Sequence, residues 1–239
     1  MNKLVYDQVF TLTTGMFDEQ ESIKPYAILD IFQTIASAHA DLLGCGTAFC
    51  NEHHYGWILA RQECFIYQSP KPKDQVIVTT FPHKPGIIDF KREYIMKSLE
   101  GEILARGCAL WVLVDFNTHK MVKTSNIYPD GEFVMETQFP GKVARPASVK
   151  EEGEFINLYQ VKKSNIDVYH HMNNAKYAEV MFNYAELDAS KIKYFAICYH
   201  NEIKEQTSMQ IFKHVIGNDV YLTGCMNDTI IFTSVLKGA

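Results

Sequence analysis

The chain has 239 residues and a formal net charge of −5, and 47% of its residues are hydrophobic, 13% aromatic and 21% charged. This composition suits a globular protein with a sizeable core, and the acidic balance excludes general binding to nucleic acid or to an anionic membrane surface. No apolar stretch approaches the ~20 residues that a membrane-spanning helix requires. The N-terminus has neither a signal-peptide core nor a transit segment, so we expect a cytoplasmic protein.

The six cysteines form no CxxC pair, and several of them fall within apolar runs. We therefore expect buried thiols in a reducing compartment. Cys50, Glu52, His53 and His54 are close in sequence but lack the separated ligand pairs of ordinary zinc sites. The sequence predicts no metal and no cofactor.

The first half is predicted to contain a strand, then a long helix, then further antiparallel strands. Between residues 24 and 43, Ile28, Ile31, Phe32 and Ile35 keep the helical period, and Gly44 is a suitable stop. Strands are predicted over residues 58–67, 75–81, 87–96 and 103–116. The last two of these strands are predicted to form a hairpin around Gly101.

Prolines, glycines and charges interleave from about residue 128 to residue 154, which is typical of a linker. The same order of elements then repeats, with tight turns at Gly217-Asn218 and Asn227-Asp228. The predicted elements are strands over 157–162, 195–203, 208–215, 220–225 and 229–236, and a helix ending near residue 187. The pattern predicts an α+β protein of two tandem units (1–130 and 155–239) joined by a linker (131–154). In each unit, one curved antiparallel sheet wraps around a long central helix.

A polar segment precedes the second helix. Asp167 and His171 lie just before an amphipathic run, and Asn173 or Asn174 is a natural N-cap for it. Helix N-termini carry unpaired N–H groups that favour negative charge. The segment therefore predicts a proton-transfer group beside a place where an oxyanion can form.

The two halves differ at this segment. Asp18 aligns with Asp167, but Ser22 stands in place of His171, and Pro70 falls near the position of Glu202. Titratable groups thus gather in the second half only. We infer an asymmetric site, because a purely structural role predicts these residues in both halves or in neither.

The family resemblance rests on four segments. Residues 164–177 look like the motif S-D-x-D-x-N-x-H-V-N-N-x-x-Y, residues 199–202 like Y-x-x-E, residues 57–59 like W-x-L, and residues 70–74 like the start of P-x-x-x-D/G-x-V. In these segments the chain resembles acyl-acyl-carrier-protein thioesterases, the double hot-dog enzymes that end fatty acid synthesis. Tyr169 replaces the family's Asn, and Ile203 replaces a family Cys.

The resemblance implies catalytic roles for Asp167, His171 and Glu202. Glu202 is expected to act as general base or to place the water, His171 to orient that water or protonate the sulfur, and Asp167 to fix His171 or its loop. Tyr169 is expected to supply a hydroxyl in place of the lost amide. The expected oxyanion donors are the backbone N–H groups near residues 173–175, which include Asn173 and Asn174.

The first unit is expected to be non-catalytic and to bind the acyl chain through Trp57, Phe32 and Ile35. The expected partner is an acyl carrier protein bearing a fatty acyl-phosphopantetheine. Because the carrier protein is acidic, its docking requires a local basic face on this chain. Candidate docking residues are Lys71, Lys73, Lys84, Lys91, Arg92, Lys162 and Lys163.

Two other functions stay open at this point. The same fold hydrolyses acyl- or aromatic-acyl-coenzyme A, and Tyr169 can also mark a catalytically decayed acyl-binding protein. Acyl chain length, saturation and the choice between monomer and homodimer do not follow from the sequence.

Overall fold

A computed structural model describes residues 3–123, 127–129 and 131–238. The elements of the first unit are β1 (Tyr6–Thr11), α1 (Pro25–Leu42), α2 (Thr47–His53), β2 (Tyr55–Ile66), β3 (Gln75–Pro82), β4 (Phe90–Ser98), β5 (Ile103–Asp115) and β6 (Lys120–Met121). Those of the second unit are β7 (Glu154–Gln160), α3 (Asn174–Ala185), β8 (Ile192–Tyr199), β9 (Ser208–Ile216), β10 (Asp219–Met226) and β11 (Thr229–Gly238).

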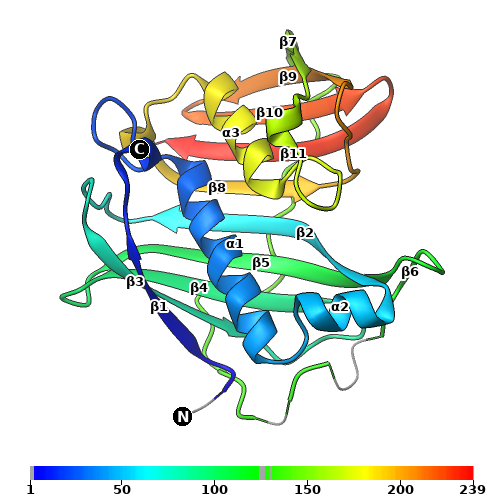
Figure 1. The fold of residues 1–239 in the computed structure, drawn as a ribbon. Coiled ribbons are helices and arrows are strands. Elements are labelled where there is room, and N and C mark those ends of the chain that lie inside the picture. The colour runs from blue at the N-terminus through cyan, green and yellow to red at the C-terminus, as the bar shows by residue number, and fades with distance from the viewer. Residues whose placement is uncertain (1–2, 124–126, 130, 239) are drawn as a thin grey trace.

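All the strands belong to one antiparallel sheet with the order β1-β3-β4-β5-β2-β8-β11-β10-β9-β7, and β6 pairs with β5. The two units meet where β2 pairs with β8, from Arg61 opposite Cys198 to Phe65 opposite Tyr194. The long helices α1 and α3 lie side by side against the same face of this sheet (Figure 1). The predicted arrangement, one sheet around one long helix in each unit, is confirmed.

Helix α1 forms where the apolar period predicts it. Pro25 occupies the first turn, where its missing N–H costs nothing, and Gly44 follows the last turn at φ +75°. Phe32 is fully buried against β5, and a Cβ atom on Gly107 would come within 2.4 Å of its ring. A glycine at this strand position lets the helix approach the sheet closely.

The internal repeat is visible in backbone bonds. Phe17 bridges to Ile23 in the first unit as Ile166 bridges to Met172 in the second, and a short 3-10 turn precedes each bridge (Thr14–Met16 and Lys163–Asn165). This confirms the alignment of Asp18 with Asp167.

The alignment also corrects one position. The N–H groups of Tyr67 and Gln68 bond to Leu104 O, just as those of His200 and Asn201 bond to Ile231 O. The next residue in each case is Ser69 and Glu202. The counterpart of Glu202 is therefore Ser69, one residue before Pro70. The sequence alone placed it only approximately, because both residues lie in loops, where no strand period fixes the register.

The sequence predicts a strand before the first helix without giving its bounds, and it does not predict helix α2 or the short strand β6. Strand β1 contains Asp7, Gln8 and Thr11, and its residues alternate between half-buried and exposed at the edge of the sheet. Helix α2 has only seven residues and ends at His54 in the left-handed conformation. The local sequence pattern of both elements is weak, so their structure is decided by tertiary contacts. Strand β8 also ends at Tyr199, so that Glu202 lies in the following loop.

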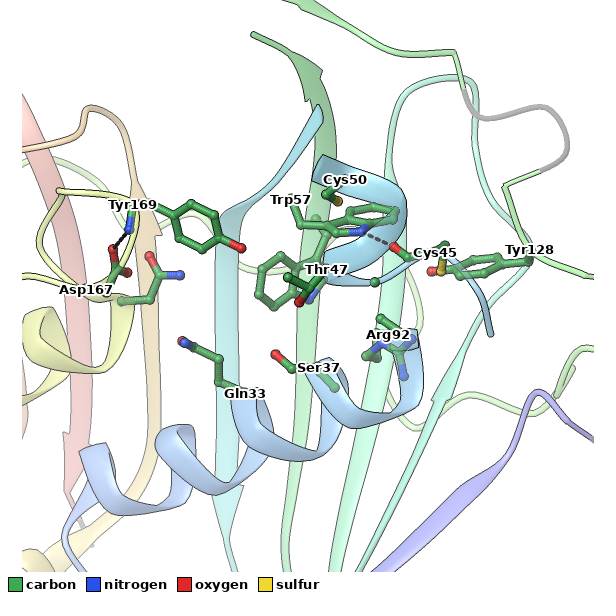
Figure 2. A pocket seen from close by; sticks show the side chains of 15 residues that line it. Gln33, Ser37, Cys45, Thr47, Cys50, Trp57, Arg92, Tyr128, Asp167 and Tyr169 are labelled. Carbon is green, nitrogen blue, oxygen red and sulfur yellow. Dashed lines mark hydrogen bonds between the residues drawn. The ribbon is translucent and has the colours of Figure 1, made fainter. Parts of the chain in front are cut away.

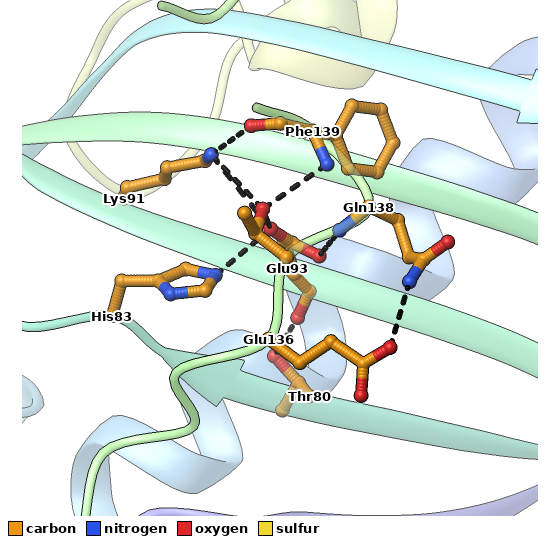
Figure 3. A network of polar contacts seen from close by, with 8 residues as sticks. Thr80, His83, Lys91, Glu93, Glu136, Gln138 and Phe139 are labelled. Atoms are coloured by element: carbon orange, nitrogen blue, oxygen red, sulfur yellow. Dashed lines mark hydrogen bonds and ion pairs between the residues drawn. The ribbon is translucent and has the colours of Figure 1, made fainter. Parts of the chain in front are cut away.

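The segment between the units is bound to the outer face of the sheet through Glu93 of β4 (Figure 3). Its carboxylate, 2% exposed, accepts hydrogen bonds from Thr137 Oγ1 and Gln138 N, and His83 Nε2 lies 2.8 Å from it. Lys91 Nζ, 3.7 Å from the same carboxylate, donates to Phe139 O. Lys91 is thus engaged in this network rather than free for docking.

All six cysteines are free and buried, as predicted. Among the described residues, no helix is long and apolar enough to cross a membrane.

We predict that Glu93→Gln lowers the free energy of unfolding by about 1–3 kcal/mol at pH 7. Burial alone would raise the pKa of Glu93, but the hydrogen bonds from His83, Thr137 and Gln138 outweigh it and leave this pKa below its ordinary value. The stabilisation is therefore complete above the ordinary glutamate pKa of about 4.3 and is lost as pH falls through the folded value. Urea unfolding of both proteins from pH 7 to pH 3 measures this, and a difference that grows on acidification would contradict it.

Candidate active site

The loop before α3 is a tight turn held by its own backbone. Asp167 N donates to His171 O at 3.0 Å, and His170 N donates to Asp167 O at 3.1 Å. His170 takes the left-handed conformation, with φ 64°, which reverses the chain. The turn thus places His171 at the start of the segment that enters the helix.

Glu202 is positioned by the loop that follows β8. Asn201 Nδ2 donates to Ile230 O at 2.7 Å, and the N–H groups of His200 and Asn201 both bond to Ile231 O. One backbone bond, from Met172 N to Ile203 O at 3.0 Å, joins this loop to the one carrying His171.

His171 Nε2 and Glu202 Oε2 lie 3.1 Å apart. Their side chains are 28% and 51% exposed, so both groups are open to water and to a ligand. Two of the three residues with expected catalytic roles, His171 and Glu202, thus come together although they are 31 positions apart in sequence. The first unit has Ser22 and Ser69 at the equivalent places, and Ser69 Oγ accepts a bond from Ile23 N at 2.9 Å.

The Asp167 carboxylate stabilises the loop. Its Oδ1 accepts a bond from Tyr169 N at 2.9 Å, while no bond joins the carboxylate to the His171 ring within the described chain. Asp18, its counterpart, is more fully occupied, since it accepts from Gln20 N, Ser22 N and Ala189 N. Of the two expected roles for Asp167, fixing the ring or fixing the loop, these contacts favour the second.

The start of α3 leaves fewer free donors than expected. Asn173 is the N-cap, because its Oδ1 accepts a bond from Ala175 N at 2.9 Å, and its own N–H donates to Asn165 O. Of the N–H groups of residues 173–175, that of Asn174 is the one without an acceptor in the described part of the structure. Asn174 is therefore the remaining backbone candidate for oxyanion binding.

Two cavities meet at this loop. Trp57, Asp167, Tyr169 and Asn174 line both of them. One extends past His171, Glu202, Tyr199 and His119 and has a volume of about 440 Å³. The other runs beside α1 into the first unit, and the Tyr169 side chain extends from the Asp167 loop toward Trp57 (Figure 2).

Tyr169 keeps its proton near neutral pH. Burial, and then the nearby Cys50 and Asp167, raise the pKa of its hydroxyl. The hydroxyl is therefore available as a hydrogen-bond donor at the junction of the cavities.

The three expected acyl-binding residues separate in the structure. Trp57 lines both cavities, and its Nε1 donates to Cys45 O at 2.8 Å. Phe32 and Ile35 are fully buried and belong to the core between α1 and the sheet. The face of α1 that lines the cavity is instead Gln33, Ala36, Ser37 and Ala40.

Sequence reasoning missed two parts of this cavity, namely α2, which contributes Thr47 and Cys50, and Arg92 as a wall residue. The sequence contained a signal for Arg92. It lies at every-second-residue spacing with Phe90, Tyr94 and Met96, so it shares their buried face of β4. Arg92 is 4% exposed, so it is unavailable for docking a carrier protein.

The fold is shared with solved structures. An acyl-ACP thioesterase from Bacteroides thetaiotaomicron superposes with a TM-score of 0.84 at 18% identity, covering 100% of both chains. The 12:0-ACP thioesterase from Umbellularia californica gives a TM-score of 0.82 at 18% identity, covering 99% of this chain and 97% of that one. The architecture is that of the double hot-dog proteins, as expected.

Sequence models define the family. The acyl-ACP thioesterase N-terminal domain matches residues 3–129, and the acyl-ACP thioesterase C-terminal domain matches residues 148–233. The protein belongs to the acyl-ACP thioesterase family, as its motifs predicted.

Curated relatives also share low sequence identity with this chain. An oleoyl-acyl carrier protein thioesterase of Arabidopsis thaliana is 24% identical, with 73% of this chain and 53% of the relative covered. That of Coriandrum sativum is 22% identical, with 88% and 66% covered. This chain spans about half to two thirds of the length of these relatives, both of which are described as chloroplastic.

We predict that Asn173→Ala lowers the free energy of unfolding by about 1 kcal/mol, because the Ala175 N–H at the start of α3 loses its side-chain acceptor. Asn183→Ala, at an exposed position within the same helix, is the matched control and is expected to be neutral or slightly stabilising. Thermal or urea unfolding of both variants measures the difference. Equal effects at the two positions would contradict the capping role.

Proposed function

We propose that this protein hydrolyses fatty acyl thioesters of acyl carrier protein, releasing the free fatty acid and the carrier, and thereby ends fatty acid synthesis. The observation that carries the proposal is the 3.1 Å contact between His171 and Glu202 in the wall of one of the two cavities that meet at the loop before α3. The family models and the carrier-protein thioesterases among the relatives support the same substrate class.

In the proposed reaction, Glu202 removes a proton from water as the water oxygen bonds to the thioester carbonyl carbon. The proton passes across the 3.1 Å contact to His171. When the carbon–sulfur bond breaks, His171 gives this proton to the departing sulfur. The second proton of the water stays with the fatty acid, so no further reactant is needed.

Negative charge develops on the carbonyl oxygen during this reaction. The free N–H of Asn174 is the proposed backbone donor, supported by the positive end of the α3 dipole. The Tyr169 hydroxyl is the proposed second donor, in place of the side-chain amide that the family motif carries at this position.

The two units have different proposed tasks. The first, residues 1–130, binds the acyl chain through the cavity beside α1, and the second, residues 155–239, supplies the reacting groups. The six buried free thiols fit a reducing compartment, which supports a cytoplasmic location.

Replacing either member of the pair tests the mechanism. We expect Glu202→Gln and His171→Ala each to lower turnover at least ~100-fold, the lower range for general acid–base groups, with unchanged thermal unfolding. Glu205→Gln, exposed in the same loop, and His170→Asn, which tolerates the left-handed conformation, are the matched controls and should keep normal turnover. Near-normal turnover in Glu202→Gln would overturn the mechanism, and tight acyl binding without any turnover in the unaltered protein would favour a decayed binding protein.

The carrier can be tested separately. Lys162 and Lys163 are exposed beside the catalytic loop, so the double substitution Lys162→Glu/Lys163→Glu is expected to lower kcat/KM ~10-fold for the acidic carrier-bound substrate. The coenzyme A thioester of the same acyl group should lose less. Lys71→Glu/Lys73→Glu, on the β2–β3 turn of the other unit, is the comparison pair. Equal losses on both carriers would remove the docking role of Lys162 and Lys163.

A further inference from the structure

The cavity beside α1 has a polar wall. The helix contributes Gln33, Ala36, Ser37 and Ala40, spaced so that they share one face over about 10 Å of helix. Within the described chain, neither the Gln33 amide nor the Ser37 hydroxyl has a hydrogen-bond partner, and both point into the cavity (Figure 2). A plain alkyl chain would cover these groups without satisfying them, at a cost in free energy.

A buried guanidinium lies at the end of this cavity away from the catalytic loop (Figure 2). Arg92 is 4% exposed, and one of its terminal nitrogens donates to His39 Nδ1 at 2.9 Å and to Thr80 Oγ1 at 3.2 Å. These bonds use one end of the fork, and the Tyr128 side chain takes a further hydrogen bond from the guanidinium, so that about two of its five N–H groups remain for a ligand.

The neighbours of Arg92 do not neutralise its charge. His39 Nε2 donates to Lys3 O at 2.8 Å, so Nδ1 is the acceptor, and burial lowers the pKa of His39 to about 4. Burial raises the pKa of the Tyr128 hydroxyl to about 12, which also favours the uncharged form. Both groups are uncharged at pH 7, and no Asp or Glu of the described residues forms an ion pair with Arg92. A buried charge without a counter-ion is costly until a ligand supplies an acceptor.

We propose that this cavity selects acyl groups that carry a hydrogen-bonding oxygen beyond the thioester carbonyl. Gln33 and Ser37 bind an oxygen near the carbonyl end of the chain, and Arg92 binds one at its far end. The inference deepens the proposed thioester hydrolysis and rests on it. It assigns substrate choice to three residues outside the His171–Glu202 pair.

The first test compares substrates on the unaltered protein. Octanoyl, β-hydroxyoctanoyl, ω-hydroxyoctanoyl and suberoyl groups are loaded onto one carrier, and kcat/KM is measured for each. At least one oxygenated group is expected to exceed octanoyl by ~10-fold or more, as one additional satisfied hydrogen bond provides. An octanoyl substrate that equals or exceeds all three overturns the proposal.

Variants then assign the donors. Gln33→Leu/Ser37→Ala should remove the preference for the β-hydroxy group, and Arg92→Met the preference for ω-hydroxy or suberoyl groups. Thr34→Val, an exposed position on α1 whose hydroxyl bonds to Asp30 O, is the control and should leave the ranking unchanged. A preference that survives both cavity variants overturns the assignment, and if Arg92→Met fails to fold, the ranking on the unaltered protein decides.

Binding separates this proposal from the proposed function. Calorimetry with free octanoic, ω-hydroxyoctanoic and suberic acids measures the cavity without any turnover. If no thioester is hydrolysed but the oxygenated acids bind ~10-fold more tightly than octanoic acid, the hydrolase function fails while the cavity assignment holds. If alkyl thioesters are hydrolysed and octanoic acid binds as tightly as the others, only the selectivity for oxygen fails.

Discussion

The pairing of β2 with β8 is the constraint on which the rest of the structure depends. It joins two sheets into one and sets α1 beside α3 on the same face. Trp57, on β2, can then line both cavities, while the loop after β8 brings Glu202 to His171. Without this strand pair, the cavity of one unit and the polar groups of the other would not share a wall.

The two units share a backbone frame but carry different side chains in their loops. The backbone frame is retained in both, down to the bridges Phe17–Ile23 and Ile166–Met172. At two loop positions, the first unit has Ser22 and Ser69 where the second has His171 and Glu202. Ser69 bonds to a backbone N–H that in the second unit bonds to the carbonyl of Ile203. The same frame therefore accommodates a serine pair in one unit and a histidine–glutamate pair in the other.

Much of this could be read from the sequence, for identifiable reasons. Helix α1 and the hairpins carry strong periodic patterns and clear turn residues. Gly217 and Asn227 are two such turn residues, and both adopt a positive φ. The pair His171 and Glu202 followed from motif spacing in loops that short backbone bonds hold in place. The short helix α2 and the edge strand β1 have no comparable pattern, since contacts with the rest of the fold decide them.

The lining of the cavity beside α1 was the harder part to predict. Periodicity identifies the face of α1 that packs on the sheet, including Phe32 and Ile35, and the expected ligand residues were taken from that face. The cavity lies on another side of the helix, whose small and polar residues look like ordinary exposed positions. Which exposed face is covered by a second unit depends on the β2–β8 junction, which no local pattern encodes.

The segment between the units has a consequence for dissecting the protein. It is tied to the first unit through Glu93 and to the second through Thr223 and Thr233, which bond to Val149 N and Pro146 O. Phe139, on this segment, packs over Cys108 and Phe65 on the outer side of the sheet. Producing the two units separately would uncover apolar surface on the first unit and leave β2 and β8 as open strand edges. Neither half is therefore a self-contained module, and the two must be expressed, evolved and engineered as a single folding unit.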